Sequence, residues 1–131
     1  MGGAPEIRGL HQIALPVADL ASAVAFYRDV LGLKLIAEFD PPGLAFFDIA
    51  GTRLMLERVQ GPAKAAGTLY LRVDDVDASH RAMLARGVIF EHPPTAVHHD
   101  QSGQFGQPGE TEWMAFLRDP AGYLIAIVSR K

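Results

Sequence analysis

The sequence predicts an α+β fold made of two modules with the same βαβββ order. The first observation is an internal repeat, since a shift of 56 residues places Leu15 on Leu71 and Asp19 on Asp75. The second is that short apolar runs of strand length surround one helix-like segment in each half. The third is that a glycine, Gly32 or Gly87, follows each helical pattern where a helix usually ends. Two copies of one supersecondary unit explain all three.

The first half of the chain supplies a strand, a helix and three more strands. The apolar run 10–17 predicts the first strand, and Asp19 is the expected N-cap of the helix that follows. The apolar positions of this helix keep the helical period: Leu20, Val24, Tyr27 and Leu31. Strand-like runs then occupy residues 33–39, 45–49 and 53–57.

The second half repeats this order and contains one long insertion. Residues 68–73 predict a strand, and Asp75 is the expected N-cap of a helix that ends before Gly87. The segment 92–110 is polar and is expected to be a long loop. The remaining strands are expected at 88–90, 113–117 and 123–128, the last two joined by a turn at 119–122.

Composition favours one domain and excludes several partners. The 131 residues are 49% hydrophobic and carry a net charge of −3, so nucleic acid and anionic membranes are not expected as partners. We expect a single domain over 8–131, with modules at 8–59 and 68–129, a linker at 60–67 and a flexible N-terminus at 1–7. The absence of cysteine excludes thiolate metal sites. No run is long enough to span a bilayer, and a cytoplasmic protein is expected.

Three motifs make the family resemblance specific. The first half contains VADL at 17–20 and AFYRDVLGL at 25–33, and the second half contains DPAGYLI at 119–125. With the paired βαβββ plan, these motifs resemble the vicinal oxygen chelate superfamily, which includes glyoxalases, bleomycin-resistance proteins and extradiol dioxygenases. The resemblance covers about residues 10–128. It implies two sheets that form a half-open barrel around a central cavity, which in many relatives holds a divalent metal.

The resemblance also identifies where metal ligands would stand in this chain. The four corresponding positions are Gln12, Met55, Thr68 and Ala126. Only Gln12 could coordinate a hard cation, so no metal cofactor is expected at the standard site. The alternative is a displaced divalent-metal site that combines Glu57 with His98 or His99. His11 is one residue out of phase with Gln12 and is expected on the opposite face of its strand.

Strand alternation gives further candidates for the cavity lining. Arg53, Met55 and Glu57 share one face of a strand, as do Thr68, Tyr70 and Arg72. The expected hairpin pairing places Trp113 beside Ala126, also in the cavity, although Trp113 could instead fill the core. Such a lining suits a ligand with an apolar ring or acyl body and one anionic end. Arg53 or Arg72 would hold that end, and Gln12 or Tyr70 would orient it.

Two classes of function follow from these candidates. The first is a small-molecule binding protein of the bleomycin-resistance type, with the ligand in the sheet-lined cavity and no intact standard metal site. The alternative is a lyase or isomerase acting on a carbonyl or enolisable substrate, with Glu57 as general base in an apolar cavity. A homodimer is expected, because association covers open sheet edges. The segment 98–106 has the composition of a flap over a site or of a surface excursion.

Overall fold

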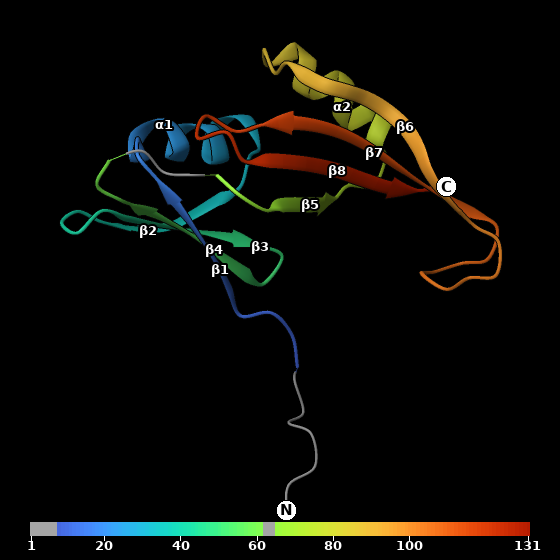
Figure 1. The fold of residues 1–131 in the computed structure, drawn as a ribbon, viewed down its shortest axis with the longest axis horizontal. Helices are drawn as coiled ribbons and strands as arrows, with labels where there is room; N and C mark the ends of the chain where they lie inside the picture. The colour runs from blue at the N-terminus through green and yellow to red at the C-terminus, as the bar shows by residue number, and fades with distance from the viewer. Residues whose placement is uncertain (1–7, 62–64) are drawn as a thin grey trace, which may run out of the picture.

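The computed structural model describes residues 8–61 and 65–131, which form two four-stranded sheets (Figure 1). The first module contains β1 (Gln12–Val17), α1 (Leu20–Ala25), η1 (Phe26–Val30), β2 (Lys34–Phe39), β3 (Leu44–Ile49) and β4 (Thr52–Arg58). The second contains β5 (Thr68–Arg72), α2 (Val76–Ala85), β6 (Phe90–Asp100), β7 (Glu110–Arg118) and β8 (Leu124–Arg130). The expected flexible segment 1–7 and residues 62–64 of the expected linker lie outside the described residues.

The two sheets have the same topology, and the predicted α+β class is confirmed. Their strand orders are β1-β4-β3-β2 (sheet A) and β5-β8-β7-β6 (sheet B). In each sheet the first strand of the module pairs in parallel with the last, and the other pairs are antiparallel. Between them the described strands form no closed barrel, because each sheet keeps two free edges.

Both helices begin where the capping residues predict. The carboxylate of Asp19 accepts a hydrogen bond from the Ser22 N–H at 3.1 Å, and that of Asp75 accepts from the N–H groups of Asp77 and Ala78. The first helix is not one uninterrupted α-helix, however. After Ala25 it continues as the π-helical turn η1, in which the Leu31 N–H donates to the Phe26 carbonyl.

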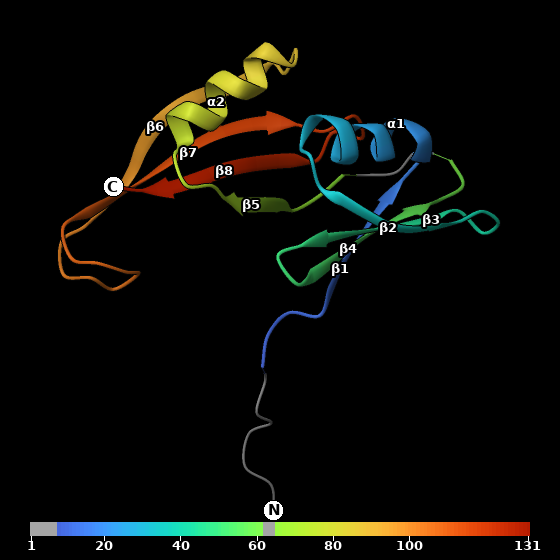
Figure 2. The same cartoon turned by 180° about the vertical axis from the view of Figure 1, so that it is seen from behind.

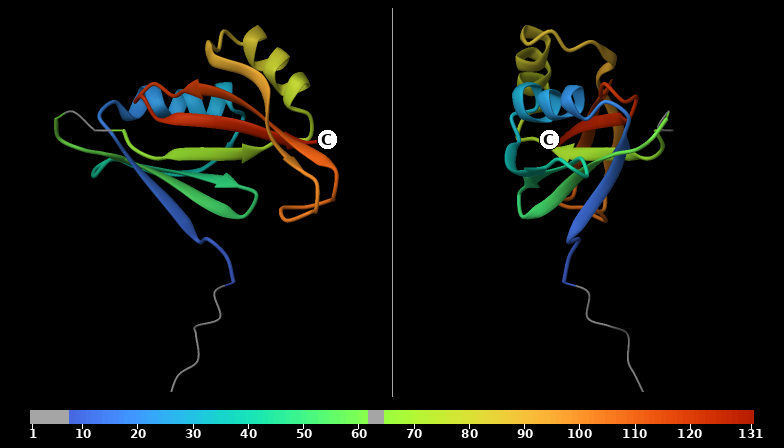
Figure 3. Two further views of the ribbon diagram at one scale, coloured as in Figure 1. Left: turned by 45° about the vertical axis from the view of Figure 1, so that its right-hand side comes forward. Right: turned by 90° about the vertical axis from the view of Figure 1, so that its left-hand side faces the viewer.

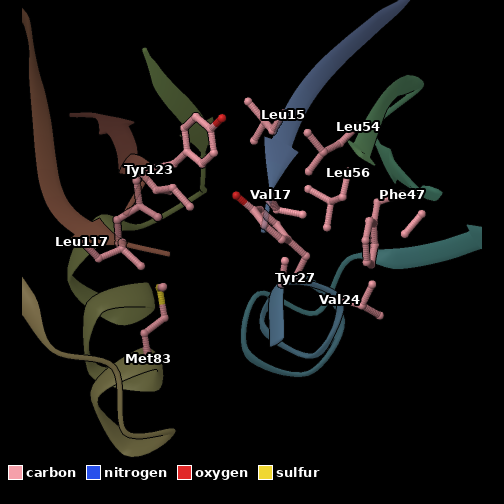
Figure 4. Close-up of a cluster of buried hydrophobic side chains, with 14 of the residues drawn as sticks. Leu15, Val17, Val24, Tyr27, Phe47, Leu54, Leu56, Met83, Leu117 and Tyr123 are labelled. Carbon is pink, nitrogen blue, oxygen red and sulfur yellow. The ribbon is translucent and has the colours of Figure 1, made fainter. Parts of the chain in front are cut away.

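The core lies between the modules and joins them. Leu15, Leu54 and Leu56 of sheet A point toward Leu117 and Tyr123 of the second module (Figure 4).

Two tyrosine hydroxyls cross this boundary in opposite directions. Tyr27 Oη donates to Asp119 Oδ2 at 2.7 Å, and Tyr123 Oη donates to the Pro16 carbonyl at 2.9 Å. Burial raises the pKa of the Tyr27 phenol and the charge of Asp119 raises it further, so Tyr27 remains a donor. The modules are therefore joined by polar contacts as well as by apolar packing.

The expected long loop at 92–110 is wrong for most of its length. Residues up to Asp100 belong to β6, and only 101–109 form a loop, which projects beyond the end of sheet B (Figure 3). The strand includes Pro93 and Pro94, which are tolerated because β6 is an edge strand, where a residue without an N–H can be accommodated. His98 and His99 consequently lie on a strand opposite Glu112 and Thr111.

The expected pairing of the last hairpin is wrong by one residue. Trp113 pairs with Ser129, and Phe116 pairs with Ala126, so Trp113 and Ala126 lie on opposite faces of sheet B. Trp113 packs against the core, with Lys131 Nζ 4.8 Å from its ring centroid. The physical reason is the turn: the Asp119 N–H donates to the Tyr123 carbonyl, which sets the register that alternation alone could not supply.

Among the described residues, neither helix has the length and the apolar character that a transmembrane helix requires.

Candidate functional site

Each sheet buries one face in the core and leaves the other open. On β4, Leu54 and Leu56 are fully buried, whereas Arg53 and Glu57 are exposed and Met55 is half-buried. The predicted alternation is therefore correct for this strand. The open face of sheet A carries the three candidate residues expected on one face of this strand, Arg53, Met55 and Glu57.

On this open face, five residues form a group that we call the Arg53 cluster: His11, Gln12, Phe46, Arg53 and Met55. Arg53 Nε donates to Gln12 Oε1 at 3.1 Å, and an Arg53 terminal nitrogen lies 2.9 Å from His11 Nε2. Gln12 Nε2 contacts Met55 Sδ at 3.7 Å, and the guanidinium lies 5.9 Å from the Phe46 ring centroid. Within the described chain Arg53 forms no ion pair, so two neutral partners and an aromatic ring hold a cation without neutralising it.

The position of His11 differs from the expectation. β1 begins at Gln12, so His11 precedes the strand and strand alternation does not govern its side chain. Its ring reaches the guanidinium of Arg53, next to Gln12 rather than on the opposite face. A neutral imidazole protonated on Nδ1 accepts this hydrogen bond through Nε2.

The residues at the expected metal positions do not fit a divalent cation. Gln12 Oε1 is the one oxygen of sheet A that could coordinate there, and it already accepts from the Arg53 guanidinium. A cation at this oxygen would lie beside a fixed positive charge and a Met55 thioether, which is a poor ligand for hard ions. Within residues 8–61 and 65–131, no group of three histidine, aspartate or glutamate side chains is arranged so that it could hold a metal ion.

The alternative metal site is not assembled either. Glu57 lies on β4 of sheet A, whereas His98 and His99 lie on β6, the far edge of sheet B. Their side chains have other contacts: His98 packs edge-on against Phe105, and His99 Nδ1 lies 3.0 Å from Thr111 Oγ1. Glu57 is exposed to solvent, so it lacks the apolar surroundings expected for a general base.

Sheet B holds the other candidates on its edge strand β5 and on β8. Tyr70 is 59% exposed and Arg72 is exposed, whereas Thr68 is half-buried. Ala126 lies between its cross-strand neighbours Tyr70 and Phe116 and is fully buried. Tyr70 and Arg72 therefore present most of the accessible surface among the sheet B candidates.

These two residues line a cavity of about 500 Å³ that we call the loop cavity, between sheet B and the loop 101–109. Its lining is formed by Tyr70, Arg72, Val73, Asp74, Phe105, Glu112, Val128, Ser129 and Arg130. Phe105 comes from the loop and is 69% exposed. Two exposed aromatic rings and the exposed Arg72 thus share one concave surface.

The loop that carries Phe105 is held by a buried carboxylate. Asp100 is 1% exposed and accepts hydrogen bonds from the backbone N–H groups of Gly103, Gln104 and Phe105. Arg130 Nη2 donates to the same carboxylate at 2.8 Å and also pairs with Glu110 and Glu112.

The same contacts determine the protonation state of Asp100. Burial raises the pKa of the Asp100 carboxyl, but the Phe105 N–H, the Arg130 guanidinium and the Gln104 N–H outweigh it and lower the pKa to about 2. The charged carboxylate fixes the loop as one wall of the cavity.

Sequence patterns missed several of these residues for identifiable reasons. Phe46 is followed by Phe47, so its place beside Arg53 depends on which face of β3 it occupies. Phe105 belongs to the expected flap segment 98–106, but Tyr70, which lines the same cavity, lies far away in the sequence. Asp100 followed by Gly103 has the composition of a turn in which an aspartate accepts from backbone N–H groups, and this signal could have been used. The role of Arg130 depends on a register that only the fold defines.

Comparison with known proteins agrees with this architecture. The sequence matches the family model of the Glyoxalase/Bleomycin resistance protein/Dioxygenase superfamily over residues 9–127. The uncharacterized protein YraH of Bacillus subtilis (strain 168) is 30% identical, over 90% of this chain and 95% of its own. A probable lactoylglutathione lyase of Vibrio cholerae serotype O1 is 29% identical, over 95% of this chain and 91% of its own.

A solved structure extends the similarity to the fold. The lactoylglutathione lyase from Agrobacterium tumefaciens superposes with a TM-score of 0.73 at 25% identity, covering 95% of each chain. This chain therefore belongs to the Glyoxalase/Bleomycin resistance protein/Dioxygenase superfamily, as its sequence motifs indicated.

Proposed function

We propose that this superfamily member is a small-molecule binding protein that needs no metal and holds an aromatic ligand in the loop cavity. The observation that carries the proposal is the placement of two exposed aromatic side chains, Tyr70 and Phe105, on one lining of about 500 Å³. They come from segments far apart in sequence, and the Asp100 contacts hold one of them in place. Rings this exposed gain apolar contact when a flat ligand lies against them.

The charged residues of the cavity define the polar end of the ligand. Arg130 is occupied by three carboxylates, whereas Arg72 forms no hydrogen bond or ion pair within the described chain. A carboxylate or carbonyl group on the ligand would therefore pair with Arg72. On sheet A the Arg53 cluster offers a second cation beside an aromatic ring and Met55.

A homodimer in the cytoplasm completes this proposal. The sheet edges β2 and β6 are free, and the edge strand β2 exposes Ile36 and Phe39. Association of two copies would cover such edges and apolar side chains. Size-exclusion chromatography coupled to light scattering tests this part of the proposal. The expected result is a mass of two chains.

Calorimetric titration with a panel of aromatic carboxylates and amides tests the binding role. Replacing Tyr70 or Phe105 by alanine should weaken binding about tenfold, because each change removes a ring from the cavity. Ile89→Ala is the matched control, since Ile89 is 87% exposed and lies outside the loop cavity. Equal affinity in all three variants would refute the assignment of the loop cavity.

Lactoylglutathione lyase activity is the second candidate, favoured by the names of two relatives. This candidate is tested by an assay of lactoylglutathione lyase activity after dialysis against Ni²⁺ or Zn²⁺. The Glu57→Gln variant is assayed beside the unmodified chain. Metal-dependent activity that disappears in Glu57→Gln would replace the binding role by a lyase with Glu57 as base. We expect no activity, because neither Gln12 nor Glu57 lies among suitable metal ligands.

A further inference from the structure

A second cavity lies between the two modules, and the proposed binding role does not use it. It has a volume of about 350 Å³, and its lining includes residues from the end of η1, from β5 and from α2. Figure 2 shows β5 and α2 in the ribbon. We call this second cavity the intermodule cavity. Tyr70 and Arg72 on the edge strand β5 also line the loop cavity, whereas Ala82 and Met83 of α2, and Arg86 at its C-cap, do not.

The walls of the intermodule cavity are mostly apolar and come from both modules. Leu31, Leu33 and Ile49 belong to the first module, and Leu71, Met83 and Ile127 to the second. A volume of this size accommodates about a dozen water-sized groups. An apolar chain or small ring could therefore contact both modules at once.

The charged groups of this cavity are all positive. Arg72 and Arg86 are its only charged residues among the described residues that line it, and no aspartate or glutamate accompanies them. Arg86 Nη1 donates to the Val30 carbonyl at 3.0 Å, which fixes its guanidinium across the module boundary. Arg72 has no hydrogen bond or ion pair to the described chain, and the Ser79 and Tyr70 hydroxyls add donors.

We propose that the intermodule cavity binds an apolar monocarboxylate about the size of octanoate. The acyl chain lies among Leu31, Leu33 and Met83, and the carboxylate pairs with the guanidinium groups of Arg86 and Arg72. The ligand contacts both modules, so its binding stabilises their association. This site shares Tyr70 and Arg72 with the loop cavity but takes its apolar contacts from residues that do not line the loop cavity.

Methionine-methyl NMR locates octanoate directly. Of the four methionines, Met83 lines the intermodule cavity, Met55 lies on the open face of sheet A, and Met114 pairs with Val128 on the open face of sheet B. Octanoate should shift the Met83 signal and leave those of Met55 and Met114 in place. An unmoved Met83 signal, or a larger shift at Met55 or Met114, would overturn the proposal.

Calorimetry with matched variants tests the contacts. Ala82→Trp fills the cavity from an exposed helix position, and Arg86→Gln removes a cation, so each should weaken octanoate binding at least about tenfold. Ala85→Trp and Arg81→Gln change similar exposed positions outside the cavity and should bind octanoate normally. Melting curves identify any variant that does not fold, and Ala82→Leu then replaces Ala82→Trp.

Two further comparisons test the role of the arginines and separate this site from the loop cavity. 1-Octanol and octylamine should bind at least about tenfold more weakly than octanoate, because they lack the negative charge. Equal binding of all three would contradict the role of the arginines. Phe105→Ala should leave octanoate affinity unchanged, so failure of the loop cavity assignment and failure of this one give different results.

Discussion

Arg53 and Arg130 lie on the last strands of the two modules in opposite surroundings. Arg53 contacts the neutral groups of Gln12 and His11, whereas Arg130 pairs with Asp100 and two glutamates. The second module thus uses its charged contacts to hold a loop in place. In the first module no carboxylate of the described chain pairs with the charge of Arg53. The same residue type is therefore part of an ion-pair network in one sheet and is held by neutral groups in the other.

The largest loss of stability is expected when Asp119 is replaced, because this buried carboxylate of the second module joins the two modules. Asp119 is 5% exposed and accepts from the Ala121 and Tyr123 N–H groups and from the Tyr27 hydroxyl. Asp119→Ala leaves these buried donors unpaired and should lower the free energy of unfolding by about 3 kcal/mol or more. Urea denaturation measures this loss. Asp119→Asn keeps one acceptor oxygen and should lose less, and equal losses would argue against the hydrogen bonds as the cause.

The next effect concerns the loop 101–109 and depends on pH. Because the pKa of Asp100 is lowered to about 2 in the folded chain, its charged form stabilises the loop above the ordinary carboxyl pKa. That contribution should be lost as the pH falls from about 4 toward 2. NMR signals of the Gly103, Gln104 and Phe105 amides should therefore move together in this range.

Asp100→Asn provides the control for this transition. The variant lacks the titrating group, and its loop amides should exchange with solvent about tenfold faster than those of the unmodified chain at neutral pH. A coordinated shift of the same amides between pH 4 and 2 in Asp100→Asn would show that another group controls the loop.

The smallest effect on stability is expected at the arginine of the first module. Arg53 is exposed and forms no ion pair within the described chain, so Arg53→Gln should change the free energy of unfolding by less than about 0.5 kcal/mol. Urea denaturation measures this change. Arg130→Gln is the matched comparison and should destabilise the protein more, because it leaves Asp100 buried without its cation. A similar loss in both variants would erase the contrast between the sheets.

The repeat made the fold predictable, because the strand end and the helix cap of the first module recur 56 residues later, and the glycine after its helix recurs 55 residues later. Asp19 and Asp75 cap their helices as predicted, since capping depends on neighbouring residues. The extent of β6 was not predictable, because Pro93 and Pro94 are compatible with a strand only at a sheet edge.

The candidate site was only partly predictable for a related reason. Alternation identified the shared face of Arg53 and Met55 because the period within a strand is local. The face of Trp113 depends on a hairpin register fixed by hydrogen bonds in the turn. Contacts such as Arg130 with Asp100 join residues that no short pattern relates.

A measurement of bound metal decides whether the protein can act as proposed, because the proposed binding role requires no metal ion. The protein should be expressed in medium with Ni²⁺, Zn²⁺, Mn²⁺ and Fe²⁺, and its metal content measured by mass spectrometry before thermal shifts with each ion. We expect less than about one-tenth of an equivalent of any metal and melting shifts below about 1 °C. One metal ion per chain, with a large shift that Gln12→Ala abolishes, would contradict the proposed binding role.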